Sequence, residues 1–136
     1  MNRLFPLAAV VLALSACSKP TDVAVQFHDA LYRGDGTKAL SLLSKPTQEK
    51  LQEFAKKAHD MSGGTVPDDP ALMIVHGDSS IYPSPTAAQP KVVRATLLSA
   101  DDKRAKVKVH VGESDHEMDL VKEGGRWRID LPIGKP

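Results

Sequence analysis

The hydrophobic pattern of this chain changes its period at Pro90, and that change constrains the fold more than any other feature. Before Pro90, most apolar residues recur every three or four positions, as they do on one face of a helix. After Pro90, apolar and polar residues alternate, which is typical of strands with one buried face. Helices followed by a run of antiparallel strands predict an α+β domain whose N-terminal helices pack on one face of a sheet.

Three helices are expected in the first half of the chain, over residues 22–33, 37–44 and 47–62. Each begins at a capping or helix-starting residue, and a glycine pair at 63–64 ends the third. The third helix is the longest. Its apolar spacing predicts a buried face made of Leu51, Phe54, Ala55, Ala58 and Met61.

Alternation and turn residues predict five strands. They cover residues 71–76, 91–99, 104–112, 116–123 and 126–131. Gly124-Gly125 lies between the last two strands, and a glycine pair suits a two-residue hairpin loop because both central residues need a positive φ. The last four strands are therefore expected to form an antiparallel meander with short turns.

The charged residues of the meander are expected on the face turned away from the helices. Alternation points Val107, Val109 and Val111 to the core and sends the neighbouring basic side chains outward, namely Arg104, Lys106, Lys108 and His110. The next strand presents Glu117, Asp119 and Glu123 on that same outer face. Opposite charges on adjacent strands predict cross-strand pairs on a solvated face. The alternative is a docking face for anionic lipid or a partner protein.

The start of the chain has the pattern of an export signal. Arg3 is followed by an apolar run over residues 4–14 and then by small residues, and this run is too short to span a bilayer. Leu14-Ser15-Ala16-Cys17 holds the only cysteine and resembles the lipobox of bacterial lipoproteins. The resemblance implies cleavage before Cys17 and lipid on its sulfur. The alternative is an ordinary signal peptide that is cut elsewhere and leaves a free thiol.

The predicted domain organisation depends on Cys17. Residues 1–16 form a lipoprotein signal peptide, 17–21 a lipidated tether, 22–132 a single α+β domain and 133–136 a tail. Two or three acyl chains make a lasting membrane anchor, because each buried methylene contributes about 0.8 kcal/mol. Ser18 stands where an aspartate would retain enterobacterial lipoproteins in the inner membrane. That resemblance implies an outer-membrane anchor with the domain in the periplasm.

The charge of the chain bears on its partners. The chain has 18 basic and 17 acidic side chains. Cleavage before Cys17 would remove one basic residue, Arg3, and no acidic one, so the two numbers become equal. A nucleic-acid-binding protein needs a net positive surface to replace the counterions of phosphates. The balance therefore argues against nucleic acid as a partner.

Three strings resemble small bacterial lipoproteins with a nuclear-transport-factor-2-like, or cystatin-like, domain. They are V-A-V-Q-F-H-D-A-L-Y-R-G-D over 23–35, A-L-S-L-L-S over 39–44 and M-D-L-V-K-E-G-G-R-W-R-I-D-L over 118–131. The resemblance implies a strongly curved sheet wrapped around the helices, forming a cone whose mouth can hold a small apolar molecule. Members of this family include enzymes and non-enzymatic binding modules, so the fold alone does not define a function.

The candidate cavity residues are His28, Tyr32 and Trp127. In isomerases and dehydratases of the family, an acid or a histidine projects into the cone beside a tyrosine, and His28 and Tyr32 share one side of the first helix. The simpler interpretation is a surface histidine and a half-buried aromatic at the edge of the core. Trp127 is more simply a core anchor of the last strand than a platform for a ligand.

The sequence predicts no catalytic residue, cofactor or metal site. The five histidines are scattered, without the spacing of a metalloprotease or the elbow of a serine hydrolase. The densest set of possible metal ligands is Glu113, Asp115, His116, Glu117 and Asp119. This set lacks the order of a calcium loop, and alternation sends neighbouring side chains to opposite faces, which favours a plain hairpin turn.

These features favour a non-enzymatic binding or interaction module of the cell envelope, with a homodimer through the open sheet face as one arrangement. An alternative is an accessory or inhibitor subunit of an envelope or secretion machine. Outer-membrane assembly factors with two helices and three strands belong to that class, and a count of five strands argues against their fold. A third alternative is an isomerase-like enzyme that uses the cone.

Overall fold

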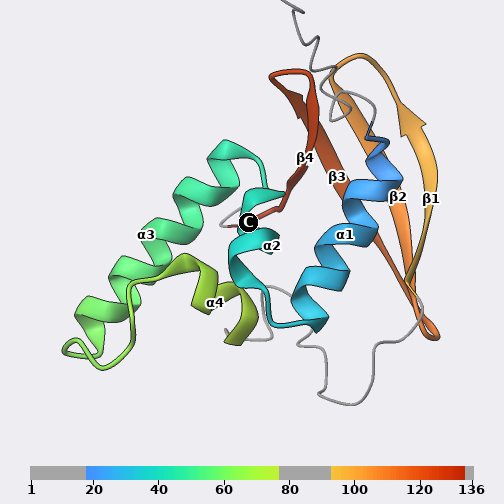
Figure 1. Cartoon of the computed structure of the whole chain (residues 1–136). Coiled ribbons are helices and arrows are strands. Elements are labelled where there is room, and N and C mark those ends of the chain that lie inside the picture. Colours follow the sequence, from blue (N-terminus) through green and yellow to red (C-terminus); the bar gives the residue numbers. More distant parts are fainter. Residues whose placement is uncertain (1–17, 77–92, 134–136) are drawn as a thin grey trace, which may run out of the picture.

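The computed structural model describes residues 18–76 and 93–133 of the 136-residue chain. Within them lie the helices α1 (Pro20–Tyr32), α2 (Gly36–Ser41), α3 (Lys45–Met61) and α4 (Pro70–His76). They are followed by the strands β1 (Val93–Ala100), β2 (Arg104–Val111), β3 (Ser114–Glu123) and β4 (Arg126–Asp130). The strands form one antiparallel sheet in the order β1-β2-β3-β4 (Figure 1). The predicted α+β class with a meander is confirmed.

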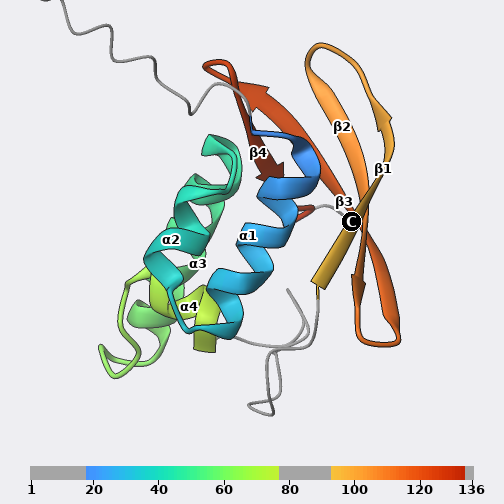
Figure 2. The same cartoon turned by 45° about the vertical axis from the view of Figure 1, so that its right-hand side comes forward.

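Helix α1 packs directly on the sheet, where it contacts β1, β2 and β4. The other described helices lie on the same side of this curved sheet, beyond α1 (Figure 2). The core fills the space between the two layers, and its largest fully buried apolar side chains are Phe27, Leu43, Leu51, Leu120, Ile129, Val107 and Val109. Val107 and Val109 therefore face the helices, as their alternation predicts.

The first three helices form close to the predicted ranges, although α2 ends at Ser41 and residues 42–44 do not belong to it. Two of these helices begin at a side-chain cap. The Asp35 carboxylate accepts a hydrogen bond from the backbone N–H of Lys38 at the start of α2. The Ser44 hydroxyl accepts a hydrogen bond from the backbone N–H of Thr47 at the start of α3. The buried face of α3 is narrower than predicted, since Phe54 is 40% exposed and Met61 is 80% exposed.

Residues 71–76, predicted to be a strand, lie in α4 instead. Pro70 takes the first position of the helix, and the Asp69 carboxylate accepts a hydrogen bond from the backbone N–H of Ala71. The helix packs against α2 and α3. The sheet consequently has four strands in the described ranges, so the expected count of five is wrong. Four described helices and four strands still differ from the two helices and three strands of the assembly factors.

The predicted hairpin loop is confirmed. Gly124 has a φ of 55° and Gly125 a φ of 78°, so both central residues take the left-handed conformation that a tight hairpin between β3 and β4 requires. The preceding hairpin is tighter than predicted, because β3 begins at Ser114 and pairs there with Val111. The two extra residues are Ser114 and Asp115, and His116, which follows them, faces inward and contacts His28 of α1.

The outer edge of β4 is covered by residues 42–44, which we call the edge segment. Leu43 forms a parallel bridge with Ile129, the Ser44 N–H donates to the Ile129 carbonyl at 2.7 Å, and the Ile129 N–H donates to the Leu42 carbonyl at 2.9 Å. The Ser44 hydroxyl also lies 2.8 Å from Thr47 Oγ1 and 3.0 Å from Asp130 Oδ1. This polar cluster joins the start of α3 to the end of the sheet.

Candidate functional site

The most unusual polar feature of the interior is a pair of histidines, His28 on α1 and His116 on β3. Their Nε2 atoms lie 3.1 Å apart, and the two rings are tilted by 35° to each other. His28 is 3% exposed, whereas His116 is partly exposed. The pair therefore reaches from the core towards the surface at the end of the sheet that carries the β2–β3 turn.

The hydrogen bonds of the pair determine its tautomers when both rings are neutral. His28 Nδ1 lies 2.9 Å from the Ala24 carbonyl, which only accepts, so this nitrogen carries the hydrogen. The Nε2 of a neutral His28 is then bare and accepts a hydrogen bond. His116 must donate from its own Nε2, which makes the contact directional.

The surroundings keep both rings neutral at pH 7. Burial lowers the pKa of His28 from 6.5 to about 4, against the opposing effect of the hydrogen bond to Ala24, and the nearby His116 lowers it further. Burial also lowers the pKa of His116, against the raising effect of the Asp115 carboxylate. Two neutral imidazoles can form this hydrogen bond. If both rings took up a proton, two Nε2–H groups would face each other and neither could accept.

The three candidate cavity residues do not meet at one place. Tyr32 lies one turn after His28 and is half-buried. Trp127 pairs with Lys122, whose Nζ lies 5.5 Å from the centroid of the indole ring. Because Lys122 is six residues from His116 along β3, at roughly 3.3 Å per residue Trp127 and His28 lie at opposite ends of this strand.

The structure also corrects the predicted surface position of His28, which is buried. The sequence held a signal for its partner, since His116 is in phase with Met118 and Leu120, both of which face the core. His28 lies four residues after Ala24 and three before Leu31, so the helical spacing already placed it on the buried face of the helix. Trp127 packs against the edge of the core, in agreement with an anchor role.

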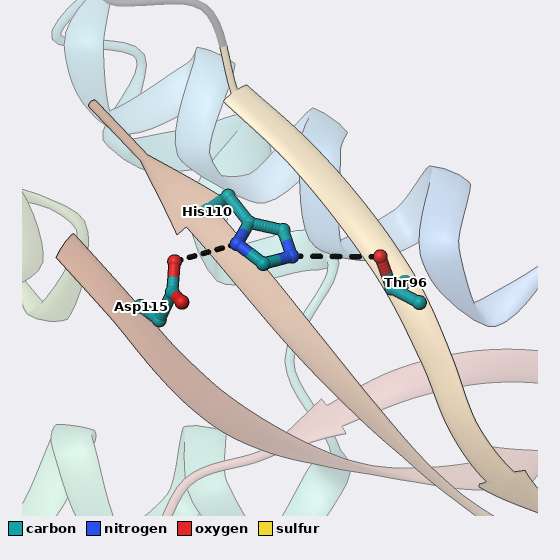
Figure 3. A network of polar contacts seen from close by, with 3 residues as sticks. All are labelled: Thr96, His110 and Asp115. Atoms are coloured by element: carbon teal, nitrogen blue, oxygen red, sulfur yellow. Dashed lines mark hydrogen bonds and ion pairs between the residues drawn. The ribbon is translucent and has the colours of Figure 1, made fainter. Parts of the chain in front are cut away.

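A second polar network lies on the outer face of the sheet, across three neighbouring strands (Figure 3). Asp115 Oδ1 lies 2.5 Å from His110 Nδ1, and His110 Nε2 lies 3.5 Å from the hydroxyl of Thr96. A carboxylate, an imidazole and a hydroxyl in this order also form the relay of serine hydrolases. Here Thr96 and Asp115 are exposed, so water would screen the charge that develops during such a reaction. We assign no catalytic role to this network.

The rest of the outer face shows the charge pairing that the sequence predicts. Lys106 Nζ lies 3.8 Å from a carboxylate oxygen of Glu117 and 3.8 Å from one of Asp119. All three side chains are well exposed, so each pair contributes less than about 1 kcal/mol to stability. Their main effect is to neutralise one another along the middle of the sheet.

No group of three or more histidine, cysteine or acidic side chains among residues 18–76 and 93–133 is arranged to hold a metal ion. The five candidate ligands near the β2–β3 turn divide between the two faces: Asp115 contacts His110 on the outside, and His116 contacts His28 inside. Cys17, the predicted lipidation site, lies outside the described residues. Of the described helices, none combines the length and apolar content needed to cross a bilayer.

Comparison with known proteins adds no relative, because the chain matches no family model, no curated protein and no solved structure. The resemblance to lipoproteins with a nuclear-transport-factor-2-like domain therefore stays a prediction. It rests on the three strings and on the order of helices and strands.

Proposed function

We propose that this chain is a lipid-anchored protein of the cell envelope whose domain acts as a non-enzymatic binding or interaction module. The observation that carries the proposal is the string Leu14-Ser15-Ala16-Cys17 directly before the folded domain. Helix α1 begins at Pro20, so only Ser18 and Lys19 separate the domain from the proposed lipid. An anchor this close holds the N-terminal end of α1 beside the bilayer.

Exposed apolar side chains support interaction as the role of the domain. Large apolar residues that are 40% to 80% exposed occur on α3, on α4, in the loop between them and on β1, namely Phe54, Met61, Val66, Leu72, Leu97 and Leu98. Exposed apolar surface commonly marks contacts with proteins or membranes when it gathers in patches, and Leu97 and Leu98 are neighbours on β1. The polar networks, by contrast, are either packed in the core or spread over an open face, which suits catalysis poorly.

The anchor is tested by growing cells that express the full chain with a labelled fatty acid. The wild-type protein should lose residues 1–16 and incorporate the label, because Cys17 supplies both the cleavage position and the acceptor sulfur. The variant Cys17→Ser should incorporate none. Ser18→Ala is the matched control and should be labelled like the wild type. An unmodified sulfur at Cys17 in the intact mass of the wild-type product would refute the anchor.

A further inference from the structure

The two edges of the sheet differ in whether another segment pairs with them. The edge segment covers β4, where residues 42–44 pair with Ile129, and Arg128 Nη1 donates to the Ser41 carbonyl. On the other side, β1 pairs only with β2 among the described residues. Within the part of the chain that the structure describes, one edge of β1 therefore presents unpaired backbone N–H and C=O groups, which form a template for a further strand.

The side chains of β1 do not guard this edge. Natural edge strands commonly carry lysine, proline or an inward-pointing charge that blocks pairing with another chain. Between Ala95 and Ala100, β1 carries no charge and no proline. Its pairing with β2 skips Leu98, so an extra residue lies at the centre of the strand, where Leu97 is 48% exposed and Leu98 is 43% exposed.

The charges at the two ends of β1 are opposite. Arg94 is the second residue of the strand, and Asp101 and Asp102 follow directly after its last residue. In an antiparallel pair of two such strands, the first end of each strand lies beside the last end of the other. Arg94 of one copy would therefore lie opposite Asp101 and beside Asp102 of the other, and the symmetry axis would pass between Leu97 and Leu98. The Asp101 carboxylate accepts hydrogen bonds from the backbone N–H groups of Lys103 and Arg104, so Asp102 is the free charge at this end among the described residues.

We propose that β1 pairs with β1 of a second copy of this chain, in antiparallel orientation, to join two sheets into one of eight strands. Backbone hydrogen bonds supply the attraction, the four central leucines bury their exposed surface, and the end charges set the register. The proposal rests on the edge of the domain alone and holds with or without a lipid on Cys17.

The test measures the subunit number of the protein purified in detergent from cells that make the full chain. Native mass spectrometry is run from about 1 to about 100 µM, because an interface below the standard size binds weakly. We expect the fraction of dimer to rise with protein concentration. At a fixed protein concentration, added detergent should not dissociate the dimer. A dimer that disappears on detergent dilution reflects two chains sharing a micelle and overturns the proposal.

Two sets of variants test the place and the orientation of the contact. Leu98→Lys should raise the dissociation constant at least about tenfold, whereas the matched control Leu72→Lys, at a leucine 45% exposed on α4, should leave it unchanged. Arg94→Glu and Asp102→Arg should each weaken the dimer, and the double variant should restore most of the loss. A protein that is monomeric throughout, a dimer indifferent to Leu98→Lys, or a double variant without rescue would each overturn the proposal.

Discussion

His28 and His116 show how one buried residue pair makes the stability of the domain depend on pH. Both rings are neutral at pH 7, and His28 is packed edge-on against Phe27 and is only 3% exposed. In the unfolded chain the same ring is hydrated and takes up a proton near pH 6.5. Acid therefore favours the unfolded state.

The sign and size of this effect give the first prediction. The pKa of His28 is lowered from 6.5 to about 4 on folding. The contribution of this ring to the free energy of unfolding is therefore fully present above pH 6.5 and is lost as the pH falls through about 4. The loss amounts to about 3 kcal/mol at the acid end. Urea unfolding at several pH values between 7 and 4 measures it.

Other groups also titrate between pH 7 and 4. The effect of His28 is therefore measured as the difference in pH dependence between the wild type and a variant that lacks this ring. His28→Asn keeps a donor for the Ala24 carbonyl but has no titrating ring, and it should flatten the pH dependence of unfolding relative to the wild type. The control Gln26→Asn, at an exposed position of the same helix, introduces the same side chain without removing a titrating ring and should leave that dependence as it is. Equal slopes for wild type and His28→Asn would contradict the buried neutral pair.

The sequence predicted single residues less well than the elements that carry them. The inward phase of His116 is readable from Met118 and Leu120, and the core side of α1 from Ala24 and Leu31. Their meeting depends on where α1 crosses the sheet, and periodicity within one element contains no such information. For the same reason Trp127 was grouped with His28 and Tyr32 as a candidate cavity, although Trp127 and His28 lie at opposite ends of β3.

At the scale of elements, one close approach fixes α2 against α4. Gly36 is buried at the start of α2, and a Cβ added there would lie 2.1 Å from the Ala71 carbonyl oxygen. Backbone cannot yield as a flexible side chain does, so Gly36→Ala should lower the free energy of unfolding by about 1 to 3 kcal/mol. Thr37→Ala, at the exposed neighbouring position, should change it by less than about 0.5 kcal/mol. Thermal unfolding followed by circular dichroism compares the two; equal stabilities would show that α4 shifts freely.

The polar cluster at the start of α3 gives a second prediction at this scale. Ser44→Ala removes the cap of Thr47 and the contact with Asp130, and it should cost about 1 to 2 kcal/mol. The exposed Ser41→Ala serves as the control and should cost far less. In a double-mutant cycle, Ser44→Ala and Asp130→Ala should fall short of additivity, because each already breaks the same contact. Strict additivity in urea unfolding would mean that the contact carries no energy.

The elements themselves were largely predictable, and the exception has a physical cause. Caps, helical spacing and the glycine pair define the first three helices and the last hairpin directly. A short apolar run such as 71–76 is compatible with a buried strand and with a buried helix, and only Asp69-Pro70 before it favours the helix. Its burial against α2 and α3 is a tertiary effect that the run does not encode.

At the scale of the whole molecule, the proposed anchor leads to a prediction about sorting. Ser18 follows Cys17, and by resemblance to enterobacterial lipoproteins an aspartate at this position implies retention in the inner membrane. In such a host, Ser18→Asp should move the protein from the outer-membrane to the inner-membrane fraction of a sucrose gradient. Ser18→Thr is the conservative control and should stay in the outer membrane. A Ser18→Asp protein that stays with the wild type would show that this host sorts it by another signal.

The class of the fold was accessible from the sequence, whereas the occupant of any site was not. A change from helical to alternating spacing requires helices on a sheet, whatever the details of packing. A ligand, a partner or a subunit count depends on surfaces assembled from distant segments, such as the edge of β1 that no described segment pairs and the covered edge of β4. The edge segment could not be foreseen, because it joins residues 42–44 to Ile129 through backbone groups that every sequence shares.

The order of helices before strands sets when this domain can fold. The apolar side of α1 is covered by β1, β2 and β4, all of which begin at or after Val93. A chain emerging from the ribosome therefore leaves Phe27 and Leu31 without the sheet until its last third has been synthesised. If the chain is exported as we propose, this delay keeps it unfolded for passage through a channel that admits unfolded chains.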